Sequence, residues 1–159
     1  MTDIPSRGDA AAPLGELRIA LEVSIPSDVR YIERVVEIVR SQCMAVLFAP
    51  RHCALNVPVA LSEALSNAIL YGNGEDPGKH VRVRAQVDDE MLVLEVSDEG
   101  AGFNLEEETN DPTQLENLER EDGRGLFLMR KLMDQVERFD CTAGNPPCGN
   151  VVRLTLSRA

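Results

Sequence analysis

The sequence predicts an α+β fold: a two-layer α/β sandwich in which a mainly antiparallel, mixed sheet carries helices on one face. Alternating apolar and polar segments come in consecutive pairs joined by short turns, as is typical of antiparallel strands. The predicted order is β-α-α-β-β-loop-α-β-β, and its irregular alternation argues against a doubly wound parallel sheet. The 159 residues suit a single domain with a useful core, which we place at residues 16–159.

The first half of the chain contains one predicted strand and two predicted helices. Residues 1–15 are rich in Ala, Pro, Gly and Asp and are expected to form a flexible tail. Residues 17–24 alternate in polarity and predict a strand. Ser27 and Asp28 are suited to cap a helix that runs to about residue 48. After a break at "APRHC", a second helix is predicted over about residues 55–72, so that His52 falls in a loop.

The second half of the chain predicts two strand pairs that flank one further helix. "KHVRVRAQVD" and "EMLVLEVSD" form the first pair, with His80 near the start of its strand, and "VERFDCTA" and "GNVVRLTLSR" form the second. Residues 104–122 contain eight acidic residues and one Arg, with little periodicity, and predict a loop. A helix is expected to restart directly after Gly123 and Gly125.

Composition narrows the classes of partner. A formal net charge of -11 disfavours nucleic acid and anionic membrane as primary partners. We find no apolar run long enough to span a bilayer, and the N-terminus lacks the features of a secretion signal. The four cysteines form no CxxC pair, which favours reduced, buried thiols in a cytoplasmic protein over disulfides.

Glu63 and Asn67 are unusual because they lie within a largely apolar predicted helix. Their spacing of four residues places one above the other on the same helix face. In isolation, a solvated helix edge explains such a pair about as well as a functional site does.

Two glycine-containing stretches accompany this pair. In "SDEGAGF", Asp98 ends an apolar strand and is followed by Gly100, Gly102 and Phe103. In "GRGLFL", Gly123, Arg124, Gly125 and Leu126 open the later helix. Either stretch alone is most simply explained as a turn.

Taken together, the three stretches resemble the N-box and the two glycine boxes of the GHKL ATPases, which have the Bergerat, or histidine-kinase-like ATPase, fold. The N-box corresponds to Glu63-x-x-x-Asn67-x-x-x-Tyr71-Gly72, and the other motifs follow in the family's order. The resemblance extends from about residue 17 to the end of the chain and implies an ATP site with Mg²⁺, in which residues 104–122 form the ATP lid. The strongly acidic character of this lid departs from what phosphates favour and is most simply a solvated face.

Physical chemistry agrees with the roles that the resemblance implies. The Asn67 carbonyl oxygen suits Mg²⁺, and Glu63 is placed to accept a proton as a general base. Asp98 suits the adenine amino group, beside Gly100, Gly102 and Phe103. Gly123, Gly125 and Leu126 would lie at a helix N-terminus suited to phosphates, and Arg124 could offset their charge.

Within this superfamily, the chain looks like the anti-sigma regulatory factors of bacterial partner switching, which are serine/threonine protein kinases. The early strand, the long first helix and "GRGLFLMRKLMDQVE" carry this resemblance. It implies a cytoplasmic homodimer that sequesters a sigma factor and phosphorylates a STAS-type anti-anti-sigma protein. Two alternatives remain open: a nucleotide-binding regulatory module without phosphotransfer, and a histidine-kinase-type catalytic domain that acts in trans.

Overall fold

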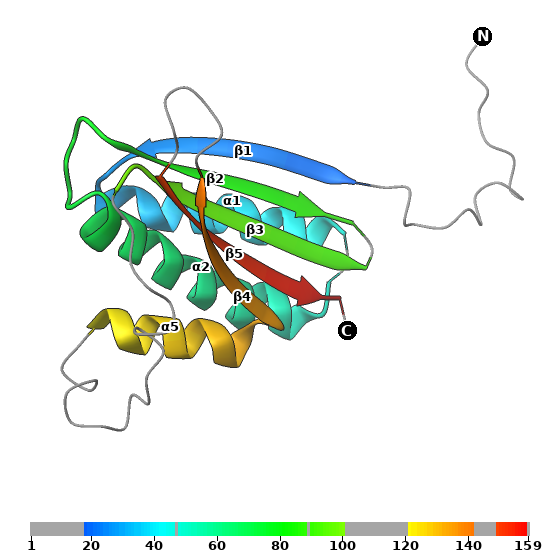
Figure 1. The fold of residues 1–159 in the computed structure, drawn as a ribbon. Coiled ribbons are helices and arrows are strands. Elements are labelled where there is room, and N and C mark those ends of the chain that lie inside the picture. Colours follow the sequence, from blue (N-terminus) through cyan, green and yellow to red (C-terminus); the bar gives the residue numbers. More distant parts are fainter. Residues whose placement is uncertain (1–17, 47, 89, 101–120, 142–148, 159) are drawn as a thin grey trace, which may run out of the picture.

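The computed structural model describes residues 18–46, 48–88, 90–100, 121–141 and 149–158. The predicted tail at residues 1–15 and most of the predicted lid at 104–122 lie outside these residues. The described part of the chain forms two layers, with the sheet on one side and the helices on the other (Figure 1).

The sheet contains five strands in the spatial order β1-β2-β3-β5-β4. Every pairing among them is antiparallel, which confirms the predicted mainly antiparallel sheet and both predicted strand pairs. The strand bounds are β1 Ile19–Pro26, β2 His80–Val87, β3 Met91–Asp98, β4 Gln135–Cys141 and β5 Gly149–Ser157.

The helices α1 (Ile32–Ala45), α2 (Val57–Asn67) and α5 (Glu121–Leu132) cover one face of this sheet (Figure 1). A 3-10 turn at Val29–Tyr31 precedes α1, and Asp28 caps it as predicted by accepting a hydrogen bond from the Arg30 amide. Helix α2 lies in the middle of the layer and packs against both α1 and α5. It therefore contributes large fully buried side chains, Leu61 and Leu65, to the core.

Helix α2 is extended at both ends by π-helical turns, at His52–Asn56 and Ala68–Gly72. The break predicted at "APRHC" is therefore shorter than expected, and His52 lies in a helix rather than in a loop. The resulting helix, His52–Gly72, is apolar and long enough to span a membrane by length and composition alone, contrary to our expectation from the sequence. Half of its most apolar window is buried inside the protein, where it packs against the sheet and the other helices.

Two buried cysteines of the helical layer lie side by side. The thiols of Cys43 on α1 and Cys53 before α2 are free and buried, with 2.9 Å between the Sγ atoms. Burial raises the pKa of the Cys43 thiol, so it stays protonated and unreactive. This agrees with the predicted buried, reduced thiols for the two cysteines whose side chains are described.

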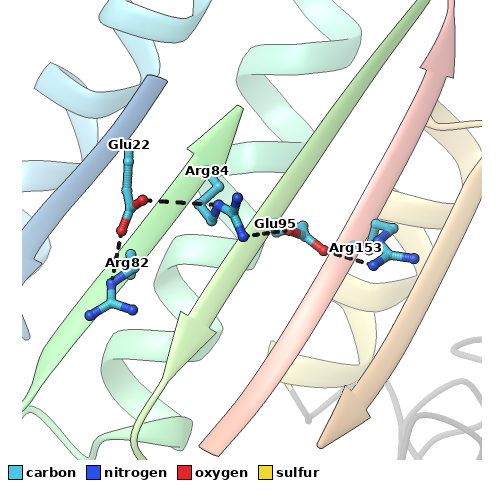
Figure 2. A network of polar contacts seen from close by, with 5 residues as sticks. All are labelled: Glu22, Arg82, Arg84, Glu95 and Arg153. Atoms are coloured by element: carbon cyan, nitrogen blue, oxygen red, sulfur yellow. Dashed lines mark hydrogen bonds and ion pairs between the residues drawn. The ribbon is translucent and has the colours of Figure 1, made fainter. Parts of the chain in front are cut away.

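The uncovered face of the sheet carries a ladder of alternating charges across four strands (Figure 2). Glu22, Arg84, Glu95 and Arg153 are register partners in sequence across β1, β2, β3 and β5. Arg82 also contacts Glu22 at 3.2 Å, and Arg153 contacts Glu95 at 2.8 Å. Because a slip of one residue would place these charges on the apolar face, the ladder favours the observed register.

Asn73 connects the end of the central helix to three other segments. Its Nδ2 donates to the Ser27 hydroxyl at 2.9 Å and to the His80 carbonyl at 3.0 Å. Its Oδ1 accepts from the Glu99 amide at 2.8 Å, immediately after β3. The side chain is buried, so these bonds replace the water that it would bind in the unfolded chain.

We therefore predict that Asn73→Ala lowers the free energy of unfolding by about 2–4 kcal/mol, because it leaves several buried polar groups without partners. Chemical denaturation monitored by circular dichroism measures this change. The control is Arg40→Ala, which removes only an exposed ion pair with Glu37 and should change stability little. Equal effects of the two substitutions would show that Asn73 does not hold these segments together.

Candidate functional site

The site is built around α2 and has two ends. At one end, α2 faces helix α5, and at the other, its π-helical extension meets the ends of β3 and β5. Each end brings together residues that the sequence analysis had placed in separate motifs.

At the first end, Glu63 and Asn67 face Gly125. A Cβ on Gly125 would lie 2.8 Å from Glu63 Oε2 and 3.5 Å from Asn67 Nδ2, so a larger residue would displace the Glu63 carboxylate while it could contact Asn67 without a clash. The predicted pairing of Glu63 with Asn67 on one helix face is thus confirmed, and that face is turned toward α5 rather than toward open solvent. Glu63 is half-buried and Asn67 is buried.

Asn67 has an unusual environment for a buried amide. Its Nδ2 makes no hydrogen bond within the part of the chain that the structure describes. A buried donor without an acceptor is costly, and an anionic ligand oxygen would satisfy it. The orphaned donor therefore fits a binding site for a phosphate-bearing ligand, next to a carbonyl oxygen suited to a hard cation.

The described residues do not form a complete metal site by themselves. Among the described residues, no group of three or more His, Cys, Asp or Glu side chains could hold a metal ion alone. Mg²⁺ commonly binds with one or two protein ligands while phosphate oxygens and water complete its shell. Asn67 as the single protein ligand is compatible with that pattern.

Helix α5 begins earlier than predicted. It starts at Glu121, so Gly123 and Gly125 lie within the helix rather than before its N-terminus. The acidic residues Glu121 and Asp122 are favourable in a first helical turn, which explains why the helix begins before the two glycines. The helix N-terminus expected at Gly123 is thus not there, and the contacts of this segment with phosphates stay a prediction.

The other residues of the predicted glycine boxes differ in how far they can be placed. Leu126 is fully buried in the core and anchors α5 there. Arg124 belongs to α5, but its side chain lies outside the described residues, as do Gly102 and Phe103. Their expected contacts with a ligand stay predictions.

At the second end, Asp98 is a buried carboxylate at the last position of β3, with 3% of its surface exposed. Its Oδ1 accepts hydrogen bonds from the Gly100 amide at 2.8 Å and from Asn150 Nδ2 at 3.0 Å. Burial raises the pKa of Asp98, and the bonds from Asn150 and Gly100 and the charge of Arg138 oppose that rise.

Three glycines crowd around Asp98 from three segments. A Cβ on Gly72 would lie 2.3 Å from Asp98 Oδ2, and a Cβ on Gly100 would lie 1.8 Å from the Gly72 carbonyl oxygen. Gly149 has a φ of +82°, and a Cβ there would lie 2.4 Å from the Asp98 carbonyl oxygen. Gly72 thus lies against the carboxylate, and Gly100 and Gly149 lie against neighbouring backbone, more closely than a residue with a Cβ would allow.

The sequence analysis missed several residues of this second end. Asn73 lies directly after the predicted second helix, and Gly149, Asn150 and Arg138 lie in predicted strands; none of the four received a role. A possible signal was the recurrence of Gly-Asn at positions 72–73 and 149–150, since both pairs flank Asp98 in the fold.

Comparison with known proteins agrees with this geometry. The family model of the histidine kinase-like ATPase domain matches residues 25–156. Among solved structures, a mycobacterial sensor histidine kinase, MprB, superposes with a TM-score of 0.52 over 86% of this chain and 97% of that chain. At 18% identity, this similarity supports the fold alone.

Curated relatives narrow the group. The chain is 38% identical to an anti-sigma F factor of Clostridium acetobutylicum, over 52% of this chain and 57% of that protein. It is 34% identical to the serine-protein kinase RsbW of Bacillus subtilis, over 51% of this chain and 54% of that protein. The matches thus span little more than half the length of these two relatives.

A further relative is covered more fully: the anti-sigma F factor of Halalkalibacterium halodurans is 33% identical over 65% of this chain and 71% of that protein. The family model, the five-stranded antiparallel sheet and the convergence of the three motifs around α2 agree with one another. This chain belongs to the histidine kinase-like ATPase domain family, in the group that contains the anti-sigma F factors.

Proposed function

We propose that this protein is an ATP-dependent serine/threonine protein kinase that also acts as an anti-sigma factor. It phosphorylates a STAS-type anti-anti-sigma protein and sequesters a sigma factor, as a cytoplasmic homodimer. The observation that carries the proposal is that Glu63 and Asn67 in the C-terminal half of α2 meet the second glycine box, while Asp98 is held beside Gly72, at the end of the π-helical turn that follows α2. The names of the relatives, anti-sigma F factor and serine-protein kinase, support the partners.

The two ends of the site would hold opposite ends of ATP. An ionised Asp98 can only accept hydrogen bonds, so it suits the amino group of adenine, which donates them. The Nδ2 of Asn67, which has no partner among the described residues, would donate to a phosphate oxygen, and its Oδ1 would serve as a ligand for Mg²⁺. When bound, Mg²⁺ supplies positive charge that offsets the charge on the phosphates.

Glu63 acts as the general base of the transfer. It accepts the proton of the substrate serine or threonine hydroxyl, whose oxygen then forms a bond to the γ-phosphorus. The bond between the γ-phosphorus and the β,γ-bridging oxygen breaks, and ADP leaves with that oxygen. Gly125 matters here because it leaves the space that the Glu63 carboxylate occupies.

We predict that Glu63→Gln lowers phosphotransfer at least about 100-fold while ATP affinity stays nearly unchanged, because the amide keeps the shape but cannot take a proton. The measurement is transfer of the γ-phosphoryl group to a STAS-domain protein from the same organism, with the acid stability of the product recorded. The matched control is Glu90→Gln, an exposed carboxylate next to the start of β3, opposite to Asp98.

Other outcomes of this assay would overturn the proposal in distinct ways. Binding of ATP without transfer by the wild type would favour a regulatory module that holds nucleotide without using it. An acid-labile product would favour a histidine-kinase-type domain that acts in trans. Transfer by Glu63→Gln at the wild-type rate would remove Glu63 from the reaction.

We predict that Asp98→Asn weakens ATP binding by about tenfold or more, because the side chain loses the charge that accepts the amino group. Titration calorimetry at neutral pH measures this loss. An unchanged affinity would exclude Asp98 from recognition of the base.

The same substitution should change stability with a defined pH dependence. Because the folded-state pKa of Asp98 is raised above its ordinary value of 3.8, wild-type stability falls as pH rises through that folded-state pKa. Asn does not ionise, so the stability of Asp98→Asn relative to wild type should increase from pH 4 to pH 7. Denaturant unfolding at both pH values tests this; a relative stability that decreases toward neutral pH would contradict it.

A further inference from the structure

Asn150 joins the carboxylate of Asp98 to a partly buried cation, Arg138. It is the register partner of Asp98 across β3 and β5, and only 1% of its surface is exposed. Its Nδ2 donates to Asp98 Oδ1 at 3.0 Å and to the Gly100 carbonyl at 3.2 Å. Its Oδ1 accepts a hydrogen bond from Nη2 of Arg138 on β4.

Arg138 fixes which way the Asn150 amide points. A guanidinium group can only donate, so the oxygen of the amide must face Arg138 and the nitrogen must face Asp98. The Arg138 side chain is 16% exposed and also contacts Asp140 Oδ1 at 3.0 Å, which holds it from the solvent side. In the series of contacts Asp140–Arg138–Asn150–Asp98, the Asn150 amide therefore has a single orientation.

The orientation of the Asn150 amide has a chemical consequence for Asp98. An amide that donates to Oδ1 favours the ionised carboxylate, because a protonated oxygen there would accept that bond poorly. The positive charge of Arg138 acts in the same direction. Without the hydrogen bond from Asn150 and the charge of Arg138, burial would raise the pKa of Asp98 with less opposition. The carboxyl group would then more readily keep its proton.

Among the residues that the structure describes, the groups facing Asp98 from the elements around it are mostly uncharged. The end of α2's π-helical extension contributes Gly72, and β5 contributes Gly149 and Asn150, none of which ionises. The neighbouring Glu99 directs its carboxylate to the backbone amide of His80. Arg138 is the charged group that the structure couples to Asp98 through Asn150.

We propose that Asn150 and Arg138 are positioning residues that make the site select a 6-amino purine over a 6-oxo purine. An ionised Asp98 accepts from the amino group of adenine and repels the carbonyl oxygen of hypoxanthine or guanine, which accepts only. A protonated Asp98 donates, and then matches the 6-oxo group instead. The pair thus acts on the base through Asp98. This inference rests on the proposed function, because it assumes that Asp98 faces a nucleotide base.

The test compares ATP with inosine triphosphate, which carries an oxygen where adenine carries the amino group. Affinities are measured by calorimetry between pH 6 and pH 8 for wild type, Arg138→Met, Arg138→Lys and Asn150→Ala. The control is Arg153→Met, which removes an arginine from the uncovered face of the sheet, where it pairs with Glu95 and stacks on Phe139.

We expect Arg138→Met and Asn150→Ala to lower the ratio of ATP to inosine triphosphate affinity by about tenfold, which corresponds to loss of one charge-assisted hydrogen bond. The loss of ATP affinity should be larger at pH 6 than at pH 8, since protonation of Asp98 causes it. Arg138→Lys should recover part of the ratio, and Arg153→Met should leave it unchanged.

The outcomes separate this inference from the proposed function. If the wild type prefers ATP but the variants keep the same ratio and pH profile, the nucleotide site stands and the positioning role is wrong. A merely structural role would weaken both nucleotides equally at every pH, which also overturns the inference. If the wild type binds neither nucleotide, both proposals fail. Should Asn150→Ala not fold, the comparison of Arg138→Met with Arg138→Lys decides the question.

Discussion

The buried carboxylate of Asp98 is the constraint on which the rest of the site depends. Placing a carboxylate where 3% of its surface meets water is costly unless donors surround it. Those donors come from the residue after next, Gly100, and from β5, through Asn150. Because β5 lies beside β3 in the sheet, Asn150 on β5 reaches the end of β3, where Asp98 lies.

Close packing of backbones follows from the same requirement. Gly72, Gly100 and Gly149 leave no room for a Cβ, so the end of the helical layer lies directly against the ends of two strands. The π-helical turn over Ala68–Gly72 helps, because its wider loop ends with the Asn73 amide bonded to the Ala68 carbonyl at 2.8 Å. Asn73 then secures the same corner through Glu99. These contacts fix the C-terminal end of α2, and α2 in turn positions Glu63 and Asn67.

Much of the fold could be predicted from the sequence because its signals are local. The alternation in β2, with Val81, Val83 and Ala85 buried between exposed Arg82 and Arg84, is visible in the sequence itself. The four-residue spacing of Glu63 and Asn67 likewise predicts a shared helix face. The predicted start of α5 was wrong: the helix begins at Glu121, before the two glycines after which it was expected to begin. The roles of Asn150 and Arg138 could not be predicted, because they depend on strand order and on contacts between residues far apart in the chain.

The central claim is that the polar pair on α2 and the carboxylate at the end of β3 form one nucleotide site. The most direct measurement is titration calorimetry of ATP with and without Mg²⁺, on wild type and on Asn67→Ala. Ser62→Ala is the control, because its hydroxyl only donates back to the Pro58 carbonyl within the helix region. The account predicts Mg²⁺-dependent binding by wild type and Ser62→Ala, and weak or Mg²⁺-independent binding by Asn67→Ala. No binding by the wild type, or the same Mg²⁺ dependence in Asn67→Ala, would contradict it.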